Sequence, residues 1–255
     1  MKLEKDISAL VTGGASGMGE ATARALAAAG AKVCVLDMNQ EKAEKVASDI
    51  GGIAVTGDVT SGSDMEAAFA KATETHGAPR IIVHCAGILI GKRVLGKEGP
   101  ADLEHFMKVI NVNLGGAFNI MRLAAAQMAP LDPLTKSGER GVIINAASIA
   151  AFEGQIGQAA YSASKGGVVA MTLPAARELA RFGIRVMAIA PGAVATPMIG
   201  DVPQEIQDSI AASVPFPSRF AEPEEFAALA LHIVENEMLN GSVIRLDGAT
   251  RLTAK

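Results

Sequence analysis

Short apolar runs alternate with helical patterns from one end of this chain to the other. Each run is apolar at successive positions, which indicates a strand that is covered on both of its faces. Strands of this kind, separated by helices, form a parallel sheet with helices on both sides. The sequence therefore predicts an α/β fold built on a doubly wound parallel β-sheet.

We expect one domain over residues 1–255, because no linker, internal repeat or low-complexity segment interrupts the alternation. The predicted strands are Ile7–Val11, Lys32–Leu36, Ile53–Val55, Ile81–Cys85, Gly141–Ala146, Ile184–Ala190 and Ser242–Leu246. The predicted helices lie near Glu20–Ala29, Gln40–Ile50, Asp64–Thr75, Asp102–Val112, Leu114–Met128, Ala160–Phe182 and Glu224–Glu235. Two further segments have irregular patterns: the polar insertion Ala129–Arg140, and Ala193–Phe220, which we expect to form a mobile flap over a substrate site.

The composition excludes several classes of function. The net charge of -4 gives no reason to expect a nucleic acid or an anionic membrane as the main ligand. We find neither a targeting segment nor an apolar stretch of the ~20 residues that span a bilayer. The two cysteines, Cys34 and Cys85, are expected to be buried free thiols. These features predict a soluble cytoplasmic protein.

A glycine-rich turn follows the first predicted strand and leads into the first helix. Four glycines stand between Thr12 and Gly19, at positions 13, 14, 17 and 19. Glycines in this setting let the backbone approach a pyrophosphate, and the helix N-terminus supplies N–H groups and a positive dipole end. Although the spacing departs from the usual G-x-G-x-x-G fingerprint, the context predicts a dinucleotide site on a Rossmann-type fold.

Asp37 ends the second predicted strand. A carboxylate at this place accepts hydrogen bonds from the adenosine ribose hydroxyls and repels a 2′-phosphate. The sequence therefore predicts NAD as the cofactor.

The only tyrosine of the chain, Tyr161, is followed four residues later by Lys165. On a helix this spacing places the two side chains on one face. An ammonium group beside a phenol favours the phenolate and should lower the phenol pKa from its reference near ~10. A phenol tuned in this way can exchange a proton with an alcohol. The hydroxyl of Ser148, just after a predicted strand, could hold the substrate oxygen beside Tyr161.

The four histidines, at positions 76, 84, 105 and 232, have no paired ligand spacing, so we expect no metal.

Together these motifs resemble the short-chain dehydrogenase/reductase family over nearly the whole chain. The Thr12–Gly19 turn is similar to the family's cofactor motif, and Asn113 matches its helix asparagine, which kinks the helix and holds a water linked to the lysine. The resemblance implies a catalytic tetrad of Asn113, Ser148, Tyr161 and Lys165, with Ser148 and Tyr161 also contacting the substrate. His84-Cys85 departs from the Asn-Asn half of a family motif, which leaves open the usual structural hydrogen bonds of the first asparagine but not the fold.

The resemblance also implies a set of cofactor contacts. The expected cofactor-binding residues are Gly13, Ser16, Gly17, Met18, Gly19, Asp37, Asp58, Val59, Cys85, Ala86, Gly87, Tyr161, Lys165, Pro191, Val194 and Thr196.

Several stretches resemble one group within that family, the type-2 3-hydroxyacyl-CoA dehydrogenases. They are residues 141–165, the insertion 129–140, and the segments 214–219 and 240–248. This resemblance implies NAD-linked oxidation of an acyl-CoA substrate, some tolerance for steroids, and a homotetramer.

Other functions stay open at this point. A 3-oxoacyl-(acyl-carrier-protein) reductase would run toward the alcohol with NADPH, which Asp37 disfavours. A sugar or steroid dehydrogenase of the same family is possible because the segment 193–220 would shape the pocket. A protein that only senses NAD would have no need for Tyr161 and Lys165 together.

Overall fold

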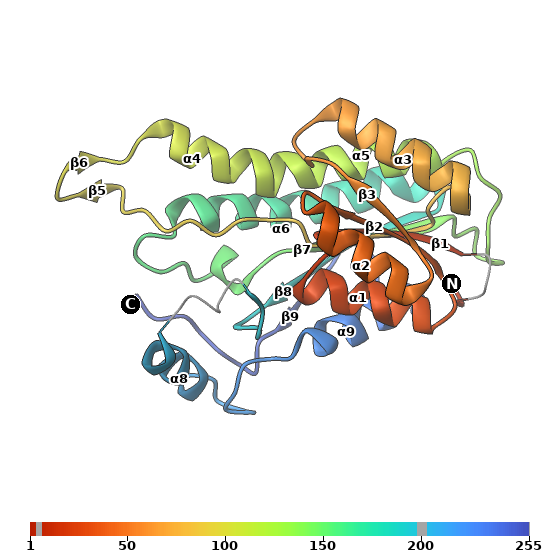
Figure 1. The fold of residues 1–255 in the computed structure, drawn as a ribbon. Coiled ribbons are helices and arrows are strands. Elements are labelled where there is room, and N and C mark those ends of the chain that lie inside the picture. The colour runs from red at the N-terminus through yellow and green to blue at the C-terminus, as the bar shows by residue number, and fades with distance from the viewer. Residues whose placement is uncertain (4–6, 198–202, 255) are drawn as a thin grey trace.

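The computed structural model describes residues 1–3, 7–197 and 203–254. Its main sheet has seven strands in the order β3-β2-β1-β4-β7-β8-β9, and every paired neighbour in it is parallel (Figure 1). The strands are β1 (Ser8–Thr12), β2 (Lys32–Asp37), β3 (Ile53–Thr56), β4 (Ile81–His84), β7 (Gly141–Ala146), β8 (Ile184–Pro191) and β9 (Val243–Leu246). The prediction of a parallel α/β sheet is confirmed.

Helices cover both faces of this sheet (Figure 1). The helices are α1 (Gly17–Ala28), α2 (Gln40–Ile50), α3 (Gly62–His76), α4 (Leu103–Ile110), α5 (Gly116–Met128), α6 (Ala159–Leu179), α8 (Gln204–Ala212) and α9 (Pro223–Glu235). One apolar core joins one face of the strands to Leu26 of α1 and Phe226 of α9. A second core joins the other face to Phe69 of α3, Ile120 of α5 and Leu179 of α6. Both faces are therefore buried, as the continuous apolar strands require.

The order of the strands fixes where a ligand can bind. After β1, the chain pairs outward through β2 and β3, and then returns to the other side of β1 through β4, β7, β8 and β9. In open parallel sheets, ligands bind beyond the carboxyl ends of the strands at the point where the order reverses. That point lies between β1 and β4, where the glycine turn after Thr12 meets the segment after His84.

The two helices expected at 102–112 and 114–128 are joined rather than separate. A π-helical turn, Asn111–Gly115, links α4 to α5, and Asn113 lies within it. Single π turns inside helices widen the backbone spiral locally and are often found at functional sites. The boundary expected at residue 113 therefore marks a real irregularity, although not a break.

A helix and a hairpin were not predicted. Within the expected flap, residues 204–212 form α8, so the expectation of an irregular segment throughout 193–220 is wrong there; residues 198–202 lie outside the described residues. A small hairpin, β5 (Leu95–Gly96) with β6 (Gly99–Pro100), projects from the sheet before α4 (Figure 1). The insertion 129–140 carries neither helix nor strand, as expected.

No helix among residues 1–3, 7–197 and 203–254 has both the length and the apolar character that a membrane span requires.

Candidate active site

The glycine turn between β1 and α1 is folded in a way that only glycine permits. Gly13 and Gly17 have φ angles of 64° and 53°, in the left-handed region that side chains disfavour. A Cβ atom on Gly13 would lie 2.8 Å from the amide nitrogen of Ala86, and one on Gly19 would collide with the Gly13 carbonyl oxygen. The turn therefore lies directly against the segment that follows β4.

The first turn of α1 is open to a ligand. Its N-cap residue, Ser16, makes no side-chain capping bond, and the first N–H groups of a helix have no partner within the helix. These groups and the positive end of the helix dipole make the turn suitable for an anion such as a pyrophosphate.

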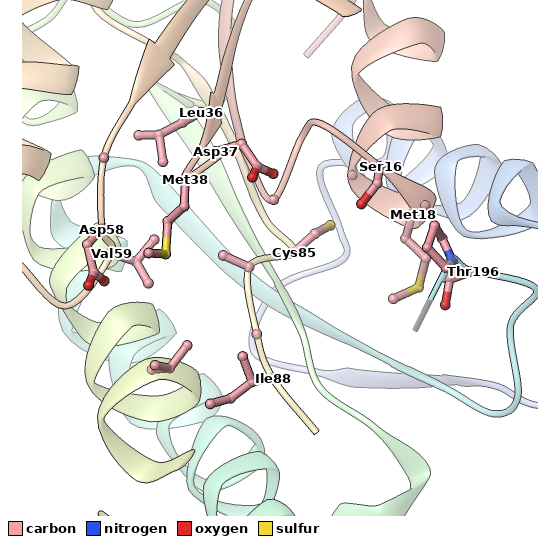
Figure 2. A pocket seen from close by; sticks show the side chains of 18 residues that line it. Ser16, Met18, Leu36, Asp37, Met38, Asp58, Val59, Cys85, Ile88 and Thr196 are labelled. Atoms are coloured by element: carbon pink, nitrogen blue, oxygen red, sulfur yellow. The ribbon is translucent and has the colours of Figure 1, made fainter. Parts of the chain in front are cut away.

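A cavity of about 300 Å³ lies over this turn (Figure 2). It is lined by twelve of the predicted cofactor residues: Gly13, Ser16, Gly17, Met18, Gly19, Asp37, Asp58, Val59, Cys85, Ala86, Gly87 and Thr196. Six further lining residues were missed: Leu36, Met38, Gly57, Ile88, Val112 and Pro197. Most are sequence neighbours of predicted residues and carry no polar group that would single them out. The glycine turn over residues 13–19, here called the glycine cradle, and the carboxylates of Asp37 and Asp58 in the same lining fit a dinucleotide.

Four predicted cofactor residues do not line this cavity: Tyr161 and Lys165, which are described below, and Pro191 and Val194. Pro191 ends β8 and is buried, and the buried Val194 forms a single bridge with Ala221. Both belong to the strand end beside Thr196, which approaches Gly17: a Cβ there would lie 3.1 Å from the Thr196 methyl group. This segment therefore contributes to the cavity wall through Thr196.

The carboxylate of Asp37 is tied to the glycine turn. One oxygen accepts from the backbone N–H of Ala15 at 3.1 Å, and the other accepts from the N–H of Asn39 at 3.0 Å. These bonds hold the negative charge at the rim of the cavity beside Met38 (Figure 2). Of the described residues that line this cavity, the charged ones are Asp37 and Asp58, and neither Lys nor Arg is among them.

His84 makes a hydrogen bond at the position where the resemblance left hydrogen bonding open. Its Nδ1 lies 2.7 Å from the hydroxyl of Thr12, which also accepts from the Ala86 N–H at 3.2 Å. Burial, and then the charge of Lys165, lower the pKa of His84 to about 3, so the imidazole is neutral. A neutral histidine here joins β1 to β4 where asparagine was expected.

The two cysteines are free, as expected, but only Cys34 is buried. Cys85 is half-buried at the wall of the cavity (Figure 2). Desolvation raises the pKa of both thiols to about 12, which argues against thiolate chemistry at either position.

Ser148 and Tyr161 meet at the same edge of the sheet. Ser148 follows β7, is buried, and its hydroxyl oxygen accepts from the Ala150 N–H at 3.1 Å. Burial raises the pKa of Tyr161, while a hydrogen bond with the Ser148 side chain lowers it. The expected lowering of the phenol pKa by Lys165 is therefore wrong: desolvation raises this pKa, and the group that opposes the rise is the Ser148 hydroxyl rather than the Lys165 ammonium.

Lys165 is buried below Tyr161, on the same side of α6. Its ammonium nitrogen lies 5.9 Å from the centre of the Tyr161 ring and donates to the carbonyl oxygen of Ala146 at 2.6 Å. Desolvation lowers the pKa of Lys165 to about 8. A Cβ on Gly87 would lie 3.5 Å from this nitrogen, so Lys165 reaches the wall of the cofactor cavity.

Asn113 fixes the backbone beyond Gly87. Its side-chain carbonyl accepts from the Ile88 N–H at 2.8 Å, and its amide donates to the Ile88 carbonyl at 2.9 Å and to Ser164 Oγ at 3.0 Å. These three bonds occupy the side chain, so a role in proton relay stays a prediction that would need another group of this residue. The structure thus brings all four predicted tetrad residues to one edge of the sheet.

The comparisons with known proteins agree with this geometry. A model of the family described as short chain dehydrogenase matches residues 8–207. The 3-hydroxyacyl-CoA dehydrogenase type-2 of Bos taurus is 50% identical over 252 residues, covering 97% of this chain and 96% of that protein. A solved structure of 3-hydroxyacyl-CoA dehydrogenase type-2 from Mycobacterium avium is similar over 100% of both chains, with a TM-score of 0.95 and 42% identity.

A solved structure of 3-ketoacyl-(acyl-carrier-protein) reductase from Brucella melitensis, complexed with NADH, is also similar. Its TM-score is 0.85 and its identity 31%, over 98% of this chain and 100% of that one.

Proposed function

Since the chain belongs to the short-chain dehydrogenase family, we propose that it interconverts 3-hydroxyacyl-CoA and 3-oxoacyl-CoA thioesters with NAD as its cofactor. The observation that carries the reaction class is the meeting of Ser148, Tyr161 and Lys165 beside the glycine cradle. The acyl-CoA substrate class is supported by the 50% sequence identity, over almost the whole chain, to a protein named 3-hydroxyacyl-CoA dehydrogenase type-2.

The side chains divide the work of oxidising an alcohol. The Ser148 hydroxyl and the Tyr161 phenol oxygen would hold the substrate hydroxyl, and Tyr161 would take its proton as a general base. Ser148 favours the phenolate through its hydrogen bond. Lys165, whose ammonium reaches Gly87, would hold the ribose next to the nicotinamide. When bound, the nicotinamide cofactor would accept the hydride that leaves the alcohol carbon.

Asp37 supports NAD over NADP. Its fixed carboxylate stands at the rim of a cavity that is lined by acidic but not by basic side chains among the described residues. A 2′-phosphate would meet this negative charge without an arginine or lysine to pair with it. The further cofactor contacts expected at Asp58, Val59 and Thr196 are part of the same proposal.

The test is a spectrophotometric assay with acetoacetyl-CoA and either NADH or NADPH. We expect turnover with NADH and a kcat/KM for NADPH at least about tenfold lower, because one unpaired charge contact costs more than ~1.4 kcal/mol. Asp37→Ser should lower the ratio of kcat/KM for NADH to kcat/KM for NADPH. The matched control is Asp49→Ser, an acidic position on α2 outside the cavity. A preference for NADPH in the unaltered protein would overturn the Asp37 argument.

The second candidate is a 3-oxoacyl-(acyl-carrier-protein) reductase. The similarity to the Brucella melitensis reductase favours it, and because that protein is complexed with NADH, the cofactor alone does not separate the two candidates. The thioester carrier separates them. We expect the CoA thioester to have the higher kcat/KM; a higher value for the same acyl group on acyl-carrier protein would favour the reductase. Without turnover of either thioester, steroids and other secondary alcohols become the candidates.

We also propose that the chain forms a homotetramer. Exposed apolar side chains on the outer sides of α4, α5 and α6 support this proposal: Leu103, Met107, Phe118 and Leu173. Light scattering coupled to size exclusion should give four times the chain mass of 26.1 kDa. A monomer mass at micromolar concentration would refute it.

A further inference from the structure

The chain between Ser148 and Tyr161 begins as one tight turn. The N–H of Ala151 donates to the carbonyl oxygen of Ser148 at 3.1 Å, and the N–H groups of Phe152 and Glu153 both donate to the carbonyl oxygen of Ile149. Ser148 and Glu153 are therefore the two ends of a single compact unit. Any group that holds Glu153 also constrains where the hydroxyl of Ser148 points.

Glu153 is held by an arginine from a distant strand. Both of its carboxylate oxygens accept from the guanidinium group of Arg245 on β9, at 2.8 and 3.0 Å. The side chains of Arg245 and Glu153 are 22% and 26% exposed, so this paired geometry is mostly shielded from water. Two parallel charge-assisted bonds fix direction as well as distance, which a single contact does not.

The rest of the guanidinium is bound on the opposite side. Its Nε donates to Asp247 at 2.7 Å, one Nη donates to the carbonyl oxygen of Thr250 at 2.9 Å, and Arg251 also contacts Asp247. The guanidinium carbon lies 5.2 Å from the centre of the Phe152 ring. Arg245 therefore donates four hydrogen bonds and cannot turn away without breaking several contacts.

The strand that carries Arg245 is itself part of the frame of the site. Arg245 pairs in register with Ala190 of β8, one residue before Pro191. A second contact from the C-terminal segment, between the Ile156 N–H and the Ala254 carbonyl oxygen at 3.0 Å, holds the same loop nearer to Tyr161. Arg251 adds a longer contact, with its Nε 3.5 Å from Glu153 Oε1. The loop between Ser148 and Tyr161 is thus attached to the C-terminal part of the chain at three points.

We propose that Arg245 is a positioning residue for the reaction: through Glu153 it fixes the turn that places the Ser148 hydroxyl against Tyr161. The inference rests on the proposed function only for the identity of the Ser148–Tyr161 pair. In this loop, the contacts of Arg245 are with Glu153 and Phe152 and not with Ser148 or Tyr161, so its effect must pass through the turn that carries Glu153.

This role predicts a signature that simple loss of stability would not give. The hydrogen bond from Ser148 favours the phenolate of Tyr161, so a displaced Ser148 should raise the phenol pKa. Because oxidation of the alcohol needs the phenolate, the rising limb of the oxidative pH profile should move to higher pH. Cofactor affinity, which depends on the glycine cradle, should hardly change.

The experiment uses Arg245→Met, Glu153→Gln and Arg245→Lys. Tyr161 is the only tyrosine and the chain has no tryptophan, so ultraviolet absorbance follows the ionisation of this one phenol directly. We expect Arg245→Met and Glu153→Gln to raise the midpoint of this titration and to lower kcat about 10- to 100-fold, as misplaced reacting groups do. Arg245→Lys keeps the charge but not the paired geometry, so its titration midpoint and its kcat should lie between those of the other two variants and those of the unaltered protein.

The matched control is Arg24→Met, which removes an arginine that binds two carboxylates, Glu20 and Asp49, on the opposite side of the sheet. NADH binding by fluorescence titration should stay within about threefold of the unaltered protein in all variants. Equal phenol titrations and equal kcat in Arg245→Met and Arg24→Met would overturn the proposal. If Arg245→Met does not fold, the nearly isosteric Glu153→Gln decides the question.

The two proposals fail in different ways. If the unaltered protein does not turn over acetoacetyl-CoA, the proposed function fails, while the phenol titration still measures the link from Arg245 to Tyr161. If turnover is rapid but the titration does not respond to Glu153→Gln, the positioning role fails alone.

Discussion

Removing the hydroxyl of Thr12 should destabilise the cofactor site by an amount that its contacts define. Thr12 is fully buried, and its hydroxyl joins the Ala86 N–H to the Nδ1 atom of His84. Thr12→Val keeps the shape but leaves both of those groups without this partner. Each unpaired buried polar group costs ~1–3 kcal/mol, so we expect a loss of about 3 kcal/mol in the free energy of unfolding.

Thermal unfolding followed by circular dichroism measures this loss. For a chain of this length, about 3 kcal/mol corresponds to a fall in Tm of roughly 6–12 °C. Thr172→Val is the matched control, because Thr172 is equally buried but its hydroxyl binds only the Val168 carbonyl of its own helix. We expect a much smaller change there. Equal Tm values for the two variants would refute the argument that Thr12 and His84 hold the site together.

Three further outcomes are expected. Tyr161→Phe should lower kcat on the order of 10²–10⁴-fold and leave NADH binding unchanged, since only the proton-transfer group is lost; full activity in steady-state assays would contradict the proposal. Ser148→Ala should raise the midpoint of the Tyr161 phenol titration, which a direct absorbance measurement checks. Burial lowers the pKa of Lys165 from 10.5 to about 8, so the unfolded chain holds this proton more tightly between those pH values. Stability should therefore rise between pH 8 and 10.5, by about 3 kcal/mol relative to Lys165→Met in urea unfolding; parallel pH dependences in the two proteins would show that this assignment is wrong.

The sequence predicts most of the fold because the pattern of each strand is set locally. A parallel strand that is buried on both faces carries a run of consecutive apolar residues, and such runs form the middle of β1, β2 and β7: Ala9–Val11, Val33–Leu36 and Val142–Ile144. The glycine turn is equally local: Gly13 and Gly17 occupy left-handed backbone that other residues avoid. These patterns also indicated where the cavity lies, because the glycine turn follows β1 and Asp37 ends β2.

The features that the sequence did not predict depend on tertiary contacts. The direction of the Tyr161 pKa follows from burial of the phenol, which no spacing in the sequence reveals. His84 stands where the family has asparagine, and its hydrogen bond to Thr12 forms because β1 and β4 are adjacent in the sheet. The two residues are far apart along the chain, so the sequence alone does not reveal this bond. The helix α8 was hidden by the prolines around it, and none of its side chains is buried to give a core-facing stripe.

In the proposed reaction, Tyr161 gives or takes the proton while a hydride moves between the cofactor and the carbon that bears the substrate oxygen. The most direct test uses NADH with deuterium at both C4 positions, acetoacetyl-CoA, and mass spectrometry of the product. We expect one deuterium at C3 of 3-hydroxybutyryl-CoA with the unaltered protein and almost no product with Tyr161→Phe. Product without deuterium, or labelled product formed equally fast by the variant, would rule out this reaction.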